Sequence, residues 1–122
     1  MIKIQNSKKY DLEERTLRFA RKIREFIKKI PKTIQNFEDS KQLNRASGSV
    51  GANYIEANEA LSKRDFLHRV KICRKETKES IFWLKLLDLN NDIILEKERQ
   101  ELIQEATELM KIFGSMVFKL DK

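Results

Sequence analysis

The chain has 122 residues, of which 37% are charged and 40% hydrophobic, and its net charge is +7. This length supports one domain with one core, and so many apolar residues at regular spacing disfavour a disordered chain. No apolar run reaches the ~20 residues of a membrane-spanning helix, neither end carries a targeting signal, and one cysteine excludes an internal disulfide. We therefore expect a single cytoplasmic domain over residues 1–122, without a membrane partner.

The first predicted helix spans residues 11–30 and follows a short, loosely held lead-in over residues 1–10. Asp11 is a suitable N-cap, because its short polar side chain can accept a hydrogen bond from the first turn. Apolar residues then recur every three or four positions, which is the spacing of one buried helical face. Pro31 ends this pattern, since proline cannot continue a helix.

The second predicted helix, over residues 39–61, contains the least bulky stretch of the chain. Gly48 and Gly51 each cost a helix roughly 1 kcal/mol relative to alanine, so propensity alone favours a turn over 47–51. Small residues spaced four apart would instead leave a bare face that a neighbouring helix can approach closely. We predict a helix here, with a buried stripe formed by Leu43, Ala46, Val50, Tyr54, Ala57 and Leu61.

The third predicted helix spans residues 63–89 and begins after a sequence that resembles a capping box, Ser62 with Asp65 three residues later. Its main apolar stripe consists of Phe66, Val70, Cys73, Thr77, Ser80, Ile81, Leu84 and Leu87. A second apolar face, formed by Ile72, Trp83 and Leu86, lies off this stripe. A bundle helix with two apolar faces indicates burial by another subunit.

The fourth predicted helix spans residues 95–119, with an acidic first half and with Gly114 either tolerated near its end or ending its regular part. Short connections and the absence of any strand-like alternation indicate an all-α protein. The sequence therefore predicts an antiparallel up-down-up-down four-helix bundle.

Basic residues form two outward tracks on the predicted helices. The first-helix track contains Arg18, Arg21, Lys22, Lys28 and Lys29. The third-helix track contains Arg64, Lys71, Arg74, Lys75 and Lys78. Such tracks can bind the phosphates of RNA or DNA, although Glu25, Glu76 and Glu79 interrupt them and a solvated face remains the alternative. Without an apparent aromatic platform, we expect contacts to the nucleic-acid backbone with little sequence reading.

The remaining polar candidates are Asn53, Glu56 and His68, which is the only histidine. Asp65 and His68 have a spacing that can hold a metal, but a di-iron bundle needs a second such pair. Asn53 and Glu56 suit a polar pair that fixes register at an interface. Cys73 suits a small apolar filler rather than an activated thiol. We predict no catalytic residue, no metal and no cofactor; the alternative is a small enzyme or ligand-binding bundle near Asn53, Glu56 and His68.

Residues 45–57 resemble the core signature of the ribosomal intervening-sequence protein family, in the pattern Arg45-Ala46-Ser47-x-Ser49-Val50-Gly51-Ala52-Asn53-Tyr54-x-Glu56-Ala57. The likeness continues through Ser62-x-x-Asp65-Phe66-x-His68 and Ile81-x-Trp83-Leu84-x-Leu86-Leu87, and it covers roughly residues 8–120. This chain has Val50-Gly51 where the commoner family pattern has Ile-Pro.

The resemblance implies a four-helix bundle that assembles as a homopentamer around a central axis. Some family members are encoded within insertions in large-subunit ribosomal RNA genes, and membership itself implies no biochemical activity. A distant relative, the accessory variability protein of diversity-generating retroelements, is a basic pentamer that binds nucleic acid and a reverse transcriptase. We therefore predict a non-enzymatic oligomeric scaffold or adaptor. Its expected partners are copies of itself and RNA, DNA or a nucleic-acid-processing protein.

Overall fold

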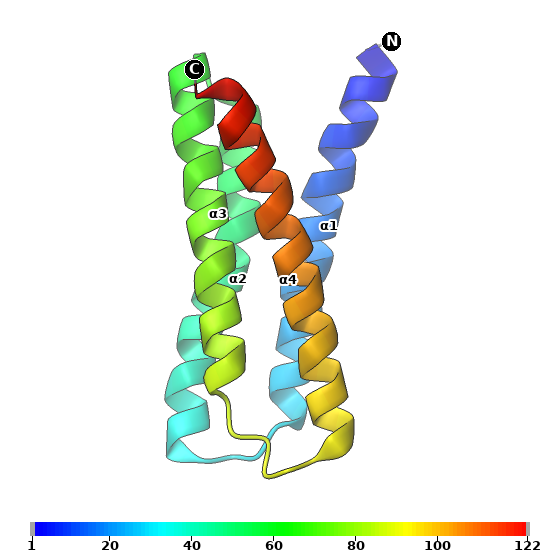
Figure 1. Ribbon diagram of the computed structural model, residues 1–122, viewed down its shortest axis with the longest axis vertical. Coiled ribbons are helices and arrows are strands. Elements are labelled where there is room, and N and C mark those ends of the chain that lie inside the picture. The colour runs from blue at the N-terminus through cyan, green and yellow to red at the C-terminus, as the bar shows by residue number, and fades with distance from the viewer. Residues whose placement is uncertain (1, 122) are drawn as a thin grey trace.

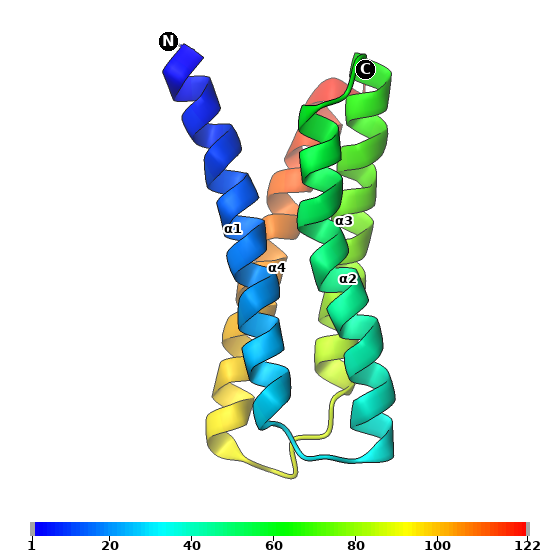
Figure 2. The same ribbon diagram turned by 180° about the vertical axis from the view of Figure 1, so that it is seen from behind.

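The computed structural model describes the backbone of residues 2–121 and the side chains of residues 12–121. In this part of the chain four α-helices follow one another without a strand: α1 (Ile2–Lys29), α2 (Ile34–Asn58), α3 (Lys63–Leu86) and α4 (Ile93–Leu120). Figures 1 and 2 show the α1–α2 and α3–α4 connections at one end of the molecule and the α2–α3 connection at the other.

The order of the helices around the bundle decides which surfaces lie side by side. Both α1 and α3 pack against α2 and α4, so α1 and α3 occupy diagonal corners. Consecutive helices run antiparallel (Figure 1), which confirms the predicted up-down-up-down bundle. Among the described residues, no helix is long and apolar enough to cross a membrane.

Helix α1 begins at Ile2, so the predicted lead-in was wrong for residues 2–10, and Asp11 lies inside the helix instead of capping it. The physical reason is that this segment is polar but contains neither glycine nor proline, so nothing interrupts helix propagation. Figures 1 and 2 show this first part of α1 diverging from the other three helices. Met1 lies outside the described residues.

Helix α2 begins earlier and ends earlier than predicted. Thr33 is its N-cap, with the Thr33 hydroxyl accepting a hydrogen bond from the backbone N–H of Asn36 at 3.0 Å. The helix ends at Asn58, and Leu61, which was predicted on its buried stripe, is 98% exposed in the following turn. The other five predicted stripe residues are buried.

Helices α3 and α4 both begin at N-cap residues, and the cap of α3 is the one that the sequence predicted. The Ser62 hydroxyl accepts a hydrogen bond from the Asp65 N–H at 3.1 Å, as the capping sequence predicts. Helix α3 ends at Leu86 rather than at residue 89. Asp92 caps α4, which then runs through Gly114 without interruption.

The glycine-bearing stretch over 47–51 is helical, as predicted, and Gly51 explains why it must lack bulk. A Cβ atom added to Gly51 would lie 2.9 Å from Thr16 Oγ1 and 3.3 Å from Thr16 Cβ on α1. Thr16 is fully buried, and its hydroxyl donates hydrogen bonds to the carbonyl oxygens of Leu12 and Glu13. The two helices therefore approach through a contact that only glycine allows at this position.

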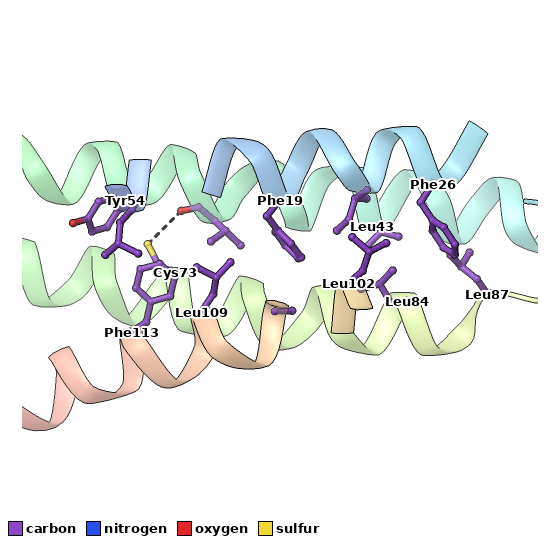
Figure 3. Packing of buried hydrophobic residues seen from close by; sticks show 14 of the residues in the cluster. Phe19, Phe26, Leu43, Tyr54, Cys73, Leu84, Leu87, Leu102, Leu109 and Phe113 are labelled. Atoms are coloured by element: carbon purple, nitrogen blue, oxygen red, sulfur yellow. Dashed lines mark hydrogen bonds between the residues drawn. The ribbon is translucent and has the colours of Figure 1, made fainter. Parts of the chain in front are cut away.

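Aromatic and aliphatic side chains from all four helices fill the centre of the bundle (Figure 3). Tyr54 of α2 and Phe113 of α4 pack with ring centroids 6.0 Å apart. Cys73 of α3 lies beside them, and its thiol donates a hydrogen bond to the Val50 carbonyl oxygen at 3.4 Å (Figure 3). This core runs along the length of the bundle and leaves the outward helix faces free for other roles.

Asn36 joins the two connections at one end of the bundle. Its Nδ2 donates to the carbonyl oxygens of Pro31 at 2.9 Å and Asp88 at 2.8 Å, while its Oδ1 accepts from the Asp88 N–H at 2.9 Å. The side chain is only 2% exposed, so these bonds satisfy backbone groups that water reaches poorly.

Arg99 of α4 donates hydrogen bonds to backbone carbonyl oxygens at the C-terminal end of α3. Its guanidinium donates to the carbonyl oxygens of Leu84 and Leu87, at 3.2 and 2.6 Å, which are among the carbonyls that a helix end leaves without partners. The same guanidinium holds the pKa of the Glu96 carboxyl at about 2, well below its usual range.

Candidate nucleic-acid interface

The outward side of α3 carries a continuous row of exposed side chains. Because Val70, Cys73, Thr77 and Leu84 of α3 point into the core, residues on the opposite side of this helix face away from the bundle. Exposed side chains recur there at intervals of three or four residues. We define the outer face of α3 by these side chains: Arg64, His68, Lys71, Lys75, Lys78, Phe82 and Lys85.

Most cations on the outer face of α3 are not neutralised within the chain. Lys71 Nζ lies 3.2 Å from the Asp121 carboxylate, whereas Arg64, Lys75 and Lys78 form no ion pair with any side chain among residues 12–121. Helix α3 contains eight Lys or Arg residues against three Asp or Glu residues. This surplus is therefore presented to solvent or to a partner.

Glu76 and Glu79 of α3, which were expected to interrupt the track, form ion pairs with a residue of α2. Arg45 lies 3.4 Å from the Glu76 carboxylate and 3.3 Å from the Glu79 carboxylate. Arg74, the remaining member of the third-helix track, is exposed on the side toward α4. Its Cδ lies 3.8 Å from the position that a Cβ on Gly114 would occupy.

The first-helix track has a different environment, because it faces the acidic half of α4. Arg18, Arg21 and Lys22 line a groove of about 540 Å³ between α1 and α4. The α4 wall of this groove carries Glu98, Glu101 and Glu105. The cations of this track therefore lie opposite carboxylates of the same chain.

Ion pairs close this α1–α4 seam at several points. Lys29 Nζ lies 2.9 Å from the Glu98 carboxylate, and Arg15 contacts Glu105 at 2.8 Å and Glu108 at 2.9 Å. Hydrogen bonds from Gln104 and then Arg15 hold the pKa of the Glu108 carboxyl below its usual range. Within α1, Lys28 pairs with Glu25 at 3.0 Å. Arg18, Arg21 and Lys22 form no ion pair among residues 12–121, but they line a groove together with carboxylates of α4. The α3 track has no such acidic wall among the described pockets, so we regard it as the less neutralised of the two.

The polar candidates Asn53, Glu56 and His68 lie near the α2–α3 turn. Asn53 donates to Ser49 and accepts a hydrogen bond from Arg69 Nη1 at 2.9 Å, so its amide links α2 to α3. Glu56 and His68 line a depression of about 350 Å³. Between residues 12 and 121, no three His, Cys, Asp or Glu side chains are grouped closely enough to hold a metal ion.

The second apolar face of α3 lies on the side of this helix that faces α2. Ile72 and Trp83 are half-buried, and Trp83 packs against the core of its own chain. Leu86 remains 50% exposed. Neighbouring helices of the same chain therefore cover part of the face that the sequence assigned to another subunit, and Leu86 is its most accessible member.

Cys73 is set up as a packing residue. Its side chain is fully buried, and burial raises the pKa of the thiol to about 12. At neutral pH the thiol is therefore protonated, whereas the thiolate is the nucleophilic form.

Sequence reasoning missed Lys85 and one other residue of the outer face, Phe82. Its side chain is 57% exposed, and its ring meets the ring of Trp83 edge-on, with centroids 5.0 Å apart and an interplanar angle of 80°. Phe82 directly precedes Trp83 and Leu84 in an apolar segment. Such a segment suggests core residues, so the exposed position of Phe82 was not recognised. The three-and-four spacing from Arg64 would have identified it.

Comparison with known proteins identifies the group to which this bundle belongs. The family model of the 23S rRNA-intervening sequence protein matches residues 8–115. Among solved structures, the chain is similar to a protein of unknown function from the S23 ribosomal protein family of Bacteroides thetaiotaomicron. The two are 31% identical, the match covers 90% of this chain and 97% of that one, and the TM-score is 0.77. No curated protein matches the chain. On the family match over residues 8–115 and this structural likeness, the chain belongs to the 23S rRNA intervening sequence protein family.

Proposed function

We propose that the protein is a non-enzymatic, self-associating scaffold of the cytoplasm that holds RNA or DNA along the outer face of α3. One observation carries this proposal: Arg64, Lys75 and Lys78 are exposed in one row and have no ion-pair partner among residues 12–121. Cations in such a row attract phosphates because binding releases the counterions condensed on the nucleic acid.

The expected contact is electrostatic and therefore dependent on salt. Four to five phosphate contacts, roughly the number of cations on the outer face, give a slope of about −3 in a plot of log affinity against log salt for a single strand. A repeated subunit would present the same row several times, so weak contacts would add through effective concentration.

Self-association is part of the proposal, and a homopentamer is the state we expect from the family resemblance. Leu86 and Trp83 support a subunit contact, because their apolar side chains remain partly exposed near the C-terminal end of α3. Light scattering should therefore give a mass near five times the 14.5 kDa of one chain. A mass equal to one chain would remove this part of the proposal.

A small enzyme or ligand-binding bundle is the second candidate. Its support is the depression near the α2–α3 turn, where Glu56, Asp65 and His68 lie together. We rank it lower because Asn53 is held by Ser49 and Arg69, and because Cys73 is buried as a neutral thiol. Native mass spectrometry of the purified protein tests this candidate, since a tightly bound metal or small molecule would favour it.

Two charge-reversal variants test the nucleic-acid proposal against a matched control. Lys75→Glu with Lys78→Glu removes two cations of the outer face of α3, and Lys22→Glu with Lys28→Glu makes the same change in net charge on α1. Binding of labelled RNA and DNA would be measured across a salt series that starts near about 50 mM.

We expect the α3 variant to weaken binding at least about tenfold at low salt and to flatten the salt slope by about 1.4, which corresponds to two lost phosphate contacts on a single strand. The α1 variant should stay within about threefold of the unmodified protein. Equal losses in both variants would mean that only net charge matters. Absence of binding by the unmodified protein at low salt would remove the nucleic-acid function.

A further inference from the structure

The outer face of α3 combines a row of cations with one exposed aromatic ring, and this combination suits one form of nucleic acid. We propose that this face prefers single-stranded over double-stranded nucleic acid, because an unpaired base stacks on Phe82. This inference rests on the function proposed above and adds the form of the ligand and the residue that recognises it.

Phe82 continues the row of cations along the same side of the helix. It lies four residues after Lys78 and seven after Lys75, which is one and two turns of an α-helix. From Arg64 to Phe82 the row is about 27 Å long, at 1.5 Å per residue. A strand whose phosphates follow Lys75 and Lys78 therefore reaches the Phe82 ring.

The Phe82 ring is held in place before any ligand arrives. Trp83 packs against the core, and the Phe82 and Trp83 rings form a T-shaped pair with a centroid distance of 5.0 Å. Edge-to-face packing of this kind stabilises an aromatic pair. A ring held in this way loses little conformational freedom when a base stacks on it.

A duplex cannot use this ring, because α3 is flanked on both sides. Helices in contact lie about 8–10 Å apart, and each is about 10–12 Å wide with its side chains. The major groove of B-DNA is about 12 Å wide, so it admits one helix but not α3 together with α2 and α4. The paired bases of a duplex therefore remain out of reach, and only its phosphates meet the outer face.

The affinity of Phe82 variants for three matched ligands tests this inference: single-stranded RNA, single-stranded DNA and a duplex of the same length. Phe82→Ala removes the ring, whereas Phe82→Trp keeps an aromatic face. Phe37→Ala is the matched control, because Phe37 is also an exposed phenylalanine beside a lysine, with Lys41 Nζ 4.5 Å from its ring centroid, but lies on α2.

We expect Phe82→Ala to weaken single-strand binding about 5- to 150-fold, which corresponds to the loss of one stacked base. Duplex binding should change less than about twofold. Phe82→Trp should restore the preference for single strands, and Phe37→Ala should leave both affinities unchanged.

Trp83 supplies an independent readout, because it is the only tryptophan in the chain and it touches Phe82. A base that stacks on Phe82 should quench Trp83 emission at concentrations that saturate single-strand binding. Inorganic polyphosphate, which has charge but no bases, should bind the same face without this quenching.

The outcomes separate this inference from the proposed function. If the protein binds single strands and duplexes equally well and Phe82→Ala changes neither, base stacking is overturned while the phosphate contact stands. Loss of oligomeric mass in Phe82→Ala would also overturn it, because the ring would then belong to a subunit contact. If the unmodified protein binds no polyanion at low salt, both proposals fail together.

Discussion

At Gly51, the absence of a side chain sets how closely α1 and α2 approach. Gly51→Ala would gain up to about 1 kcal/mol of helix propensity. It would also push a Cβ to 2.9 Å from Thr16 Oγ1, and that hydroxyl is fixed by hydrogen bonds to its own helix. Overpacking of this kind costs about 1–3 kcal/mol. We therefore expect a net loss in the free energy of unfolding, measured with urea at a fixed protein concentration.

Gly48 is the control for this prediction, because a Cβ there would meet nothing closer than the flexible guanidinium of Arg24 at 3.8 Å. Gly48→Ala should therefore stabilise the protein by up to about 1 kcal/mol. The two glycines should give opposite signs. If Gly51→Ala were as stabilising as Gly48→Ala, the close contact with Thr16 would not exist in solution.

Cys73 makes stability depend on pH in the alkaline range. Its pKa is about 12 in the folded state, because burial disfavours the thiolate, whereas an exposed thiol ionises near about 8.5. The unfolded state therefore releases its proton first as pH rises, and stability falls by about 1–2 kcal/mol between pH 8 and pH 10.

Urea unfolding at several pH values checks this expectation, with Cys73→Ala as the comparison. The variant is less stable at every pH because it leaves a cavity, but this part of the alkaline slope should disappear. Above about pH 10 the Tyr54 phenol adds to the slope, since burial raises its pKa as well. Identical slopes for both proteins would mean that Cys73 is accessible to water.

At the scale of elements, Asn36 joins the two connections at one end of the bundle. Asn36→Ala would leave the Asp88 N–H and the Pro31 and Asp88 carbonyls without this partner in a buried place. We expect a loss of about 2–3 kcal/mol in the free energy of unfolding. Thr33→Ala, which removes only the N-cap bond of α2, should cost about 1 kcal/mol. Equal costs would show that the link between the connections contributes nothing.

The sequence predicted local caps and helical faces better than it predicted contacts between residues that are distant in the chain. Ser62 and Asp65 predicted the start of α3, because both residues of the capping pair lie within four residues of sequence. The start of α2 was misplaced although its N-cap is also local, since Thr33 accepts from the Asn36 N–H three residues later. The sequence could not show that Asn36 is buried, because its side-chain partner Asp88 is 52 residues away. The bonds from Arg99 to the end of α3 likewise could not be predicted, because Arg99 belongs to α4.

The candidate site shows the same division. Both basic tracks could be found from the sequence, since helical spacing alone puts their residues on one side of each helix. Which track is neutralised could not be found, because it depends on α4 lying beside α1 and contributing Glu98 and Glu105 to the seam. Leu61 was wrongly assigned to the core for a related reason: α2 ends at Asn58, so the helical spacing no longer applies to it.

For the molecule as a whole, the diagonal arrangement of α1 and α3 separates two positive surfaces. The positive surface of α1 lies opposite the acidic half of α4. The positive surface of α3 is exposed along the outer face of this helix, where Lys71 pairs with Asp121. An oligomer built from such subunits would present several open rows to one nucleic acid, while the cations of α1 remain opposite the carboxylates of α4. In such an oligomer, bound nucleic acid should therefore lie along the outer face of α3.

Lysine footprinting tests that placement most directly. The protein would be acetylated with and without saturating single-stranded RNA at low salt, and the modified lysines would be identified by mass spectrometry. We predict protection of Lys71, Lys75 and Lys78 on α3, with Lys22 and Lys28 on α1 modified equally in both samples. Protection of the α1 lysines instead, or the same weak protection of all of them, would contradict the account.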